Sequence, residues 1–169
     1  MGRGVVMNGK TIIIAVIALV SCLAVWFWWS GDGRAIRKQL VMIEETGSKA
    51  ENEPPVEGLV KASQLAALFG DPCQVVVEVT QHEGAYARKQ IQDHILLMRS
   101  SFVQVAVTMH DIVIERIKNK TTAVRGTIRL RGKAMGEPLA DVYGFKAGMA
   151  KIDGRWLFTS LTIIEVVER

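Results

Sequence analysis

The chain has 169 residues and a mass of 18.6 kDa, the size of one globular domain with a short additional segment. Its 21 basic and 17 acidic residues give a net charge of +4, too small an excess for a nucleic-acid binder that neutralises phosphates. Two cysteines exclude a disulfide scaffold and a four-thiolate zinc site, and the three histidines lack ligand spacing. We therefore expect one folded domain that holds no metal, no cofactor and no nucleic acid.

Residues 1–10 form a short basic tail, and residues 11–30 form an uncharged run in which seventeen of twenty residues are apolar. A helix of about twenty residues spans the bilayer core, and Trp26, Trp28 and Trp29 at its end are typical of the membrane interface. We predict a retained transmembrane helix that makes this a single-pass membrane protein. A cleaved signal peptide and lipidation at Cys22, which ends a lipobox-like Leu19–Cys22, are the alternatives.

The basic residues on the two sides of this run nearly balance, so the positive-inside rule gives no orientation. A short basic tail before an export-like apolar run favours a domain outside the cytoplasm, anchored in a bacterial inner membrane. Residues 31–33 are a glycine-rich joint, and residues 34–169 are the expected domain.

The first part of the domain has helical spacing. Ile36, Leu40 and Ile43 predict a helix that ends at Gly47. After the polar loop at Pro54–Pro55, an apolar stripe predicts a second helix closed by Gly70; its members are Leu59, Ala62, Ala66 and Phe69.

The spacing then changes to a period of two over residues 73–79, returns to a helical period over 86–100, and stays strand-like to the end. We expect turns at Asn119–Lys120, at Gly132–Gly136 and at Asp153–Gly154, the last being the strongest hairpin signal. Helices at the start and hairpins at the end predict an α+β domain, with helices covering one face of a curved antiparallel sheet.

This order, together with the closing motif Lys-Ile-Asp-Gly-Arg-Trp-Leu-Phe at residues 151–158, resembles the nuclear transport factor 2-like superfamily, including its SnoaL-like branch. The resemblance covers residues 33–168 and implies a cone-shaped sheet covered by about three helices, with a pocket between them. It also implies that Trp156, Phe158 and Tyr143 support the pocket or the last hairpin. Some members are isomerases, dehydratases or cyclases, and many are non-catalytic partners in assemblies.

Enzymatic members that the domain resembles use one acid or histidine inside the cone. The candidates are Asp93 and His94 on the helix at 86–100 and Tyr143 on a later strand. No pair has a spacing that forces an acid–base dyad, and a histidine bonded to the backbone or a tyrosine lining a pocket is the commoner situation. We expect His82–Glu83 and His110–Asp111 to lie in turns, and Cys73 to be buried.

Arg125, Arg129 and Arg131 occupy odd positions of one expected strand and therefore project from one face. Such a cluster fits anionic headgroups or an acidic partner, and a solvated outer face is the plain alternative.

The anchor favours a membrane-bound, non-catalytic interaction or assembly module, with a protein partner or a second copy, because soluble enzymes of this superfamily normally lack one. The alternative is a small-molecule binder, or an enzyme of the isomerase or dehydratase type, that uses the cone pocket. Lipid carriage is a third possibility. An open apolar cone with converging titratable groups would favour the alternative, and a plugged cone the interaction module.

Overall fold

The computed structural model describes residues 31–165, so the predicted membrane segment at residues 11–30 lies outside the described residues, as do Cys22, Trp26, Trp28 and Trp29. No helix within residues 31–165 is long and apolar enough to cross a bilayer. The chain divides into two compact units, Met1–Ile36 and Arg37–Arg169, and the fold described below is that of the second unit.

Three helical segments precede or interrupt the strands. Residues 31–47 are helical, α2 spans Pro55–Ala66 and α3 spans Arg88–Ser101. Pro54 caps α2 and Pro55 takes its first position, where the missing N–H removes no hydrogen bond. The predicted stop at Gly47 and the predicted helix start at the two prolines are confirmed.

The predicted end of the second helix is wrong. Helix α2 stops at Ala66, not at Gly70, and Leu59 is exposed. Phe69 begins a strand instead, because it pairs with Phe158 and its ring lies 5.6 Å from the Phe158 ring. Packing against the sheet therefore overrides the helical spacing of this residue.

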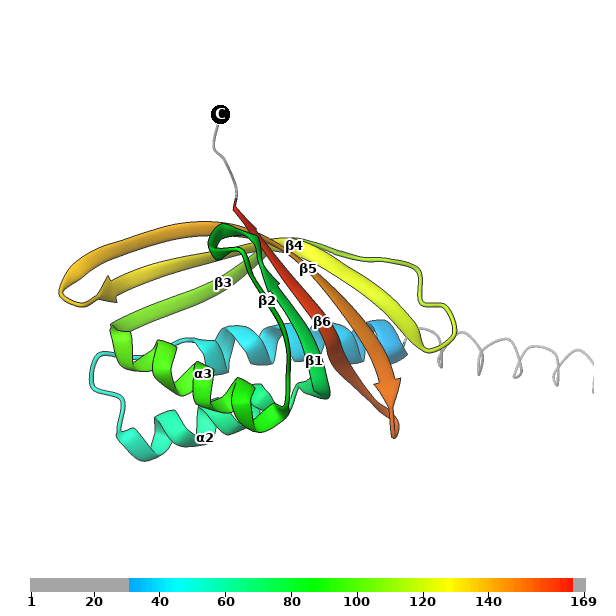
Figure 1. Cartoon of the computed structure of the whole chain (residues 1–169), viewed down its shortest axis with the longest axis horizontal. Helices are drawn as coiled ribbons and strands as arrows, with labels where there is room; N and C mark the ends of the chain where they lie inside the picture. The colour runs from blue at the N-terminus through cyan, green and yellow to red at the C-terminus, as the bar shows by residue number, and fades with distance from the viewer. Residues whose placement is uncertain (1–30, 166–169) are drawn as a thin grey trace, which may run out of the picture. The chain divides into compact units, whose positions relative to one another are not determined.

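Six strands form one curved sheet in the order β2-β1-β6-β5-β4-β3. Their bounds are β1 Phe69–Val77, β2 His82–Tyr86, β3 Phe102–Ile114, β4 Thr121–Ala134, β5 Glu137–Ile152 and β6 Arg155–Glu165, with the 3₁₀ turn η1 at Glu78–Thr80. Neighbouring strands are antiparallel, except that β1 is parallel to β6. Helices α2 and α3 lie on one side of the sheet (Figure 1). The predicted α+β architecture with a curved sheet is confirmed.

The two tightest predicted turns are also confirmed. Asn119 and Lys120 have φ of 50° and 59°, and Asp153 and Gly154 have φ of 49° and 78°. Positive φ at both central residues is what a two-residue hairpin with a type I′ turn requires, and this turn matches the twist of the strands.

The predicted loop at Gly132–Gly136 is wrong, because β4 and β5 continue almost to its end. Gly132 pairs with Leu139, and only Met135 and Gly136 form the turn. A side chain at Gly132 would collide with the backbone of Gln104 on β3, so this glycine allows close strand approach and does not break the strand.

The two histidine-containing pairs expected in turns lie in strands. His82 and Glu83 belong to β2, and His110 pairs with Thr127 on β4. Asp111 has φ of 54° where the β3 register shifts, so it forms a bulge inside the strand. Strand β2 lies at the edge of the sheet and pairs with β1. Because its residues are mostly polar, the alternation of apolar residues that predicts a strand is absent.

The sheet has an inner face, which looks toward α2 and α3, and an outer face. On β4 the inner face carries Val124 and Ile128, and the outer face carries Arg125, Arg129 and Arg131. Trp156 is buried at the start of β6, and its carbonyl oxygen accepts a hydrogen bond from Gln39 Nε2 in the first helical segment. This bond helps to fix that segment to the sheet.

Candidate functional site

A cavity of about 660 Å³ lies between the inner face of the sheet and the helices. Alternate residues of the strands form its wall, as the two-residue period of a strand requires. Val75, Phe145, Leu161 and Ile163 are examples of this apolar lining. The cavity is therefore built from the side chains that would form the core if the helices packed directly on the sheet.

One end of the cavity is closed by buried rings, and helix α3 borders an open side. Phe69 and Phe158 are 8% and 2% exposed and both line the cavity. Leu97 and Met98 on α3 also line it, yet they are 72% and 54% exposed. The sequence places Met98 on the face of Ile91 and Ile95, and the structure puts it at the rim of that face.

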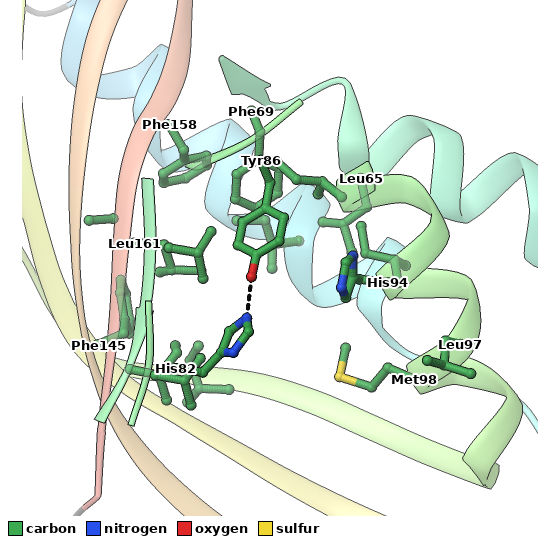
Figure 2. A pocket seen from close by; sticks show the side chains of 18 of the residues that line it. Leu65, Phe69, His82, Tyr86, His94, Leu97, Met98, Phe145, Phe158 and Leu161 are labelled. Carbon is green, nitrogen blue, oxygen red and sulfur yellow. Dashed lines mark hydrogen bonds between the residues drawn. The ribbon is translucent and has the colours of Figure 1, made fainter. Parts of the chain in front are cut away.

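Three polar side chains meet on one wall of the cavity: His82 and Tyr86 from β2 and His94 from α3 (Figure 2). The Tyr86 hydroxyl is hydrogen-bonded to His82 Nε2. The Tyr86 and His94 rings make an edge-to-face contact, with centroids 5.2 Å apart and an interplanar angle of 70°. His94 Nδ1 donates to the carbonyl oxygen of Gln90 at 2.7 Å. We call these three residues the His82–Tyr86–His94 cluster.

Strand β2 explains why two of these residues point the same way. His82, Gly84 and Tyr86 are two residues apart and share one face of the strand. A Cβ atom at Gly84 would lie 3.0 Å from the Tyr86 ring, so glycine at this position leaves room for that ring. The sequence did not indicate His82 and Tyr86 as site residues. The one available signal is that His82, Gly84 and Tyr86 alternate with the residues between them, and none of these three is an aliphatic residue of the kind that marks a buried strand face.

The three residues considered as catalytic candidates are separated in space. His94 lines the cavity, whereas Asp93 lies outside it, with one carboxylate oxygen 2.9 Å from Lys89 Nζ. Tyr143 is not among the lining residues, and its hydroxyl donates to Asp141 at 3.3 Å. Burial and the nearby Asp141 carboxylate raise the pKa of Tyr143 above its ordinary value. No two of the three candidates share the site.

The residues expected to support the pocket or hairpin have distinct positions. Phe158 lines the cavity, while Trp156 is fully buried next to the Asp153–Gly154 hairpin and does not line it. Cys73 is buried on the same face of β1 as Val75, and burial raises the pKa of its thiol to about 11. Within residues 31–165, no group of three or more metal-ligating side chains is close enough to hold a metal ion.

A buried charged cluster, which the sequence did not indicate, holds the helices in place. Arg99 at the end of α3 donates to the carbonyl oxygens of Thr46, Gly47 and Ser48, so it caps the first helical segment. Its guanidinium also lies 2.5 Å from Glu53, whose carboxylate binds Lys61 at 2.8 Å.

This cluster also affects the ionisation of its members. Burial by itself would raise the pKa of Glu53, but the hydrogen bonds from Lys61 and Arg99 outweigh it and lower that pKa. The pKa of Lys61 is raised, chiefly by its hydrogen bonds to Glu53 and Glu57. The charged forms therefore stabilise the fold at neutral pH.

Arg125, Arg129 and Arg131 lie on the outer face, away from the cavity. Arg125 is directly opposite Lys146 of β5, so a fourth cation extends the cluster. Nowhere in residues 31–165 does a carboxylate form an ion pair with these four side chains. Glu83, an acid of the outer face, is on β2, four strands away from β4, which at about 4.8 Å per strand exceeds the screening length at physiological salt. Glu115 is nearer, because its N–H donates to the Ala123 carbonyl oxygen of β4 at 2.9 Å.

No protein-family model and no curated protein matches this chain. Solved structures do match it. A nuclear transport factor 2-like protein with a cystatin-like fold from Novosphingobium aromaticivorans has a TM-score of 0.63 and 12% identity, covering 97% of this chain and 94% of its own.

Two other matches come from the same bacterium and carry enzyme names. A candidate scytalone dehydratase has a TM-score of 0.62 and 16% identity, covering 82% of this chain and 89% of its own. A candidate aromatic ring hydroxylase has a TM-score of 0.65 and 10% identity, covering 79% and 88%. The TM-scores show a shared fold, and the nuclear transport factor 2-like fold expected from the element order together with the closing motif is confirmed.

Proposed function

We propose that this domain binds a small, largely apolar molecule in the cavity between the sheet and α3. The observation that carries the proposal is the cavity itself, about 660 Å³ in volume and lined mainly by aliphatic and aromatic side chains. That volume falls in the usual range of small-molecule sites, and a ligand would remove this apolar surface from water. Of the two forms of the cone considered from the sequence, the open one favours binding over the interaction module.

The His82–Tyr86–His94 cluster supplies the polar contacts that a ligand site needs to orient its occupant. Among the described residues that line the cavity there is no carboxylate and no lysine. Acid–base chemistry would therefore depend on the two imidazoles and the phenol. The dehydratase and hydroxylase names of two structural neighbours make turnover the enzymatic extension of this proposal, and binding is its first requirement.

A homologous series of alkylbenzenes tests the proposal. The full chain is placed in lipid nanodiscs, because of the predicted segment at 11–30, and titrated by calorimetry with empty nanodiscs as the blank. Each added methylene should contribute about 0.8 kcal/mol, or roughly a fourfold gain in affinity, until the cavity is full.

Two variants of adjacent residues on β6 locate the binding. Ile163→Trp fills the cavity and should weaken binding at least tenfold, whereas Thr162→Trp places the same ring on the outer face and should leave binding unchanged. Thermal unfolding of both variants confirms that they fold. If no alkylbenzene binds, or if both variants bind as the wild type does, the cavity is not a ligand site.

The outer face favours a second function, contact with an acidic partner. Four cations lie across neighbouring strands of one face, and none of them forms an ion pair with a carboxylate within residues 31–165: Arg125, Arg129, Arg131 and Lys146. Like charges oppose pairing of this face with a second copy of itself, so an acidic protein surface is the occupant we propose.

Charge reversal tests this contact. Arg125, Arg129 and Arg131 are changed together to Glu, and partners are captured from solubilised membranes. The control reverses Arg116, Lys118 and Lys120, a matched set beside the β3–β4 turn. Loss of a partner from the first variant and not from the control would support the contact. Capture of the same partners by both variants would contradict the proposed contact with an acidic partner.

Membrane attachment through residues 11–30, with the domain outside the cytoplasm, also remains a proposal. It rests on the length of the uncharged run and on its tryptophans. Extraction of membranes with alkaline carbonate should leave the chain in the membrane fraction, and protease added to intact spheroplasts should cleave the domain. Release by carbonate, or protection from the protease, would contradict the attachment or the orientation respectively.

A further inference from the structure

The ligand's polar group can be inferred from the hydrogen-bonding state of His94. A carbonyl oxygen can only accept a hydrogen bond, so the 2.7 Å contact with the Gln90 carbonyl oxygen places a proton on His94 Nδ1. In a neutral imidazole the other nitrogen then has a lone pair and no proton. His94 Nε2 is therefore a hydrogen-bond acceptor.

This acceptor has no donor within residues 31–165, although the residue lines the cavity. The edge-to-face contact with Tyr86 fixes the plane of the imidazole (Figure 2). The ring is thus held on two sides, by the Gln90 carbonyl and by the Tyr86 ring, while Nε2 is left for a ligand.

The three hydroxyl groups that line the cavity, those of Ser100, Ser101 and Tyr86, already have hydrogen-bond partners. Ser100 Oγ donates to the Leu97 carbonyl oxygen at 2.6 Å, and Ser101 Oγ donates to the Met98 carbonyl oxygen at 2.7 Å. The Tyr86 hydroxyl is engaged with His82. His82 Nδ1 also has no partner within residues 31–165, but only for His94 does a contact with a carbonyl oxygen fix which ring nitrogen accepts. The polar requirement that the structure defines is therefore a donor for His94 Nε2.

We propose that the ligand is an apolar molecule with a hydroxyl group, a phenol or an alcohol, that donates a hydrogen bond to His94 Nε2. This proposal rests on the proposed function, because it specifies the ligand of the same cavity. The apolar body occupies the space toward Phe145 and Phe158, and the hydroxyl lies at the β2–α3 wall. An ether or a carboxylate has no proton to donate at neutral pH, so neither satisfies this acceptor.

Three probes of matched shape test the proposal: 4-butylphenol, 4-butylanisole and butylbenzene. They are titrated into the full chain in nanodiscs at pH 8.5, where an imidazole is ordinarily neutral and a phenol still protonated. A single uncharged hydrogen bond predicts that the phenol binds about threefold to tenfold more tightly than the anisole.

The variant His94→Phe keeps an aromatic ring against Tyr86 and removes the acceptor, so it should bind the phenol and the anisole equally. Asp93→Asn, one residue away and outside the cavity, should keep the wild-type preference. Equal binding of phenol and anisole by the wild type, or a preference that survives in His94→Phe, would overturn the hydroxyl proposal alone. Failure of all three probes to bind would overturn the proposed function and this proposal with it.

Discussion

The inner and outer faces of the sheet are made by the same strands, and adjacent residues have opposite roles. On β6, Ile163 lines the cavity and Ile164 lies on the outer face. On β4, Ile128 lines the cavity and Arg129 lies outside. The identity of a residue does not decide which face becomes a binding surface, since isoleucine occurs on both. The inner face becomes a binding surface because the helices cover it and enclose the cavity.

The two faces also treat charge differently. Arg125 and Lys146 are direct cross-strand neighbours on the outer face, where solvent screens their repulsion. On the helical side, the buried Arg99 has Glu53 at 2.5 Å and three carbonyl oxygens around it. Burial requires such compensation, because an uncompensated charge in the interior costs several kcal/mol.

The largest expected difference between the faces concerns side-chain volume. Phe158→Ala removes a ring that is 2% exposed and should lower the free energy of unfolding by about 3–5 kcal/mol. Thr162→Ala, on the outer face of the same strand, should change it by less than about 0.5 kcal/mol. Urea unfolding measures both. A similar decrease in the free energy of unfolding for the two variants would mean that side chains on the two faces are packed equally.

The next effect concerns the ion pair that holds the helices over the inner face. Arg99→Met should lower the free energy of unfolding by about 3 kcal/mol, because it leaves the Glu53 carboxylate buried with Lys61 as its remaining cation. Arg129→Met is the outer-face control and should be close to neutral. A neutral Arg99→Met would show that the helices do not depend on this cluster.

The same cluster should make stability sensitive to acid. The pKa of Glu53 is lower in the folded protein than its ordinary 4.5, so its stabilisation is complete above that value. The stabilisation is lost as the pH falls through the folded-state pKa. Urea unfolding between pH 7 and pH 3 should therefore show a smaller loss in Glu53→Gln than in the wild type. Glu51→Gln, an exposed neighbour, should follow the wild-type curve.

The smallest perturbation is chemical labelling of one side chain on each face of β1. Burial raises the pKa of Cys73 to about 11, so iodoacetamide at pH 8 should leave this thiol unmodified until the protein unfolds. In the double variant Cys73→Ser and Gln74→Cys, the thiol is on the exposed outer side and should react within minutes. Peptide mass mapping distinguishes these sites from Cys22. Rapid labelling of Cys73 in the native protein would contradict its burial.

Much of the fold could be predicted because local signals agreed with the final packing. Asp153–Gly154 and Asn119–Lys120 define two hairpins through backbone conformation alone. Phe69 and Gly132 could not be placed correctly, because each is controlled by a distant strand: Phe158 pairs with the first, and the backbone at Gln104 lies against the second.

The site was less predictable than the fold, since it depends on pairings between elements. His94 could be proposed from its helical face, whereas His82 and Tyr86 required knowing that residues 82–86 form an edge strand. Arg99 and Glu53 are 46 positions apart, and no spacing rule connects them. The period of two in β4 did place Arg125, Arg129 and Arg131 on one face.

The most direct test of the ligand cavity compares two adjacent isoleucines by NMR. The full chain, with isoleucine methyl groups labelled, is titrated with 4-butylphenol in nanodiscs. The account predicts that the methyl signals of Ile163 and Ile128 shift with ligand concentration, while that of Ile164 on the outer face does not. Shifts at Ile164 with none at Ile163 and Ile128 would contradict it.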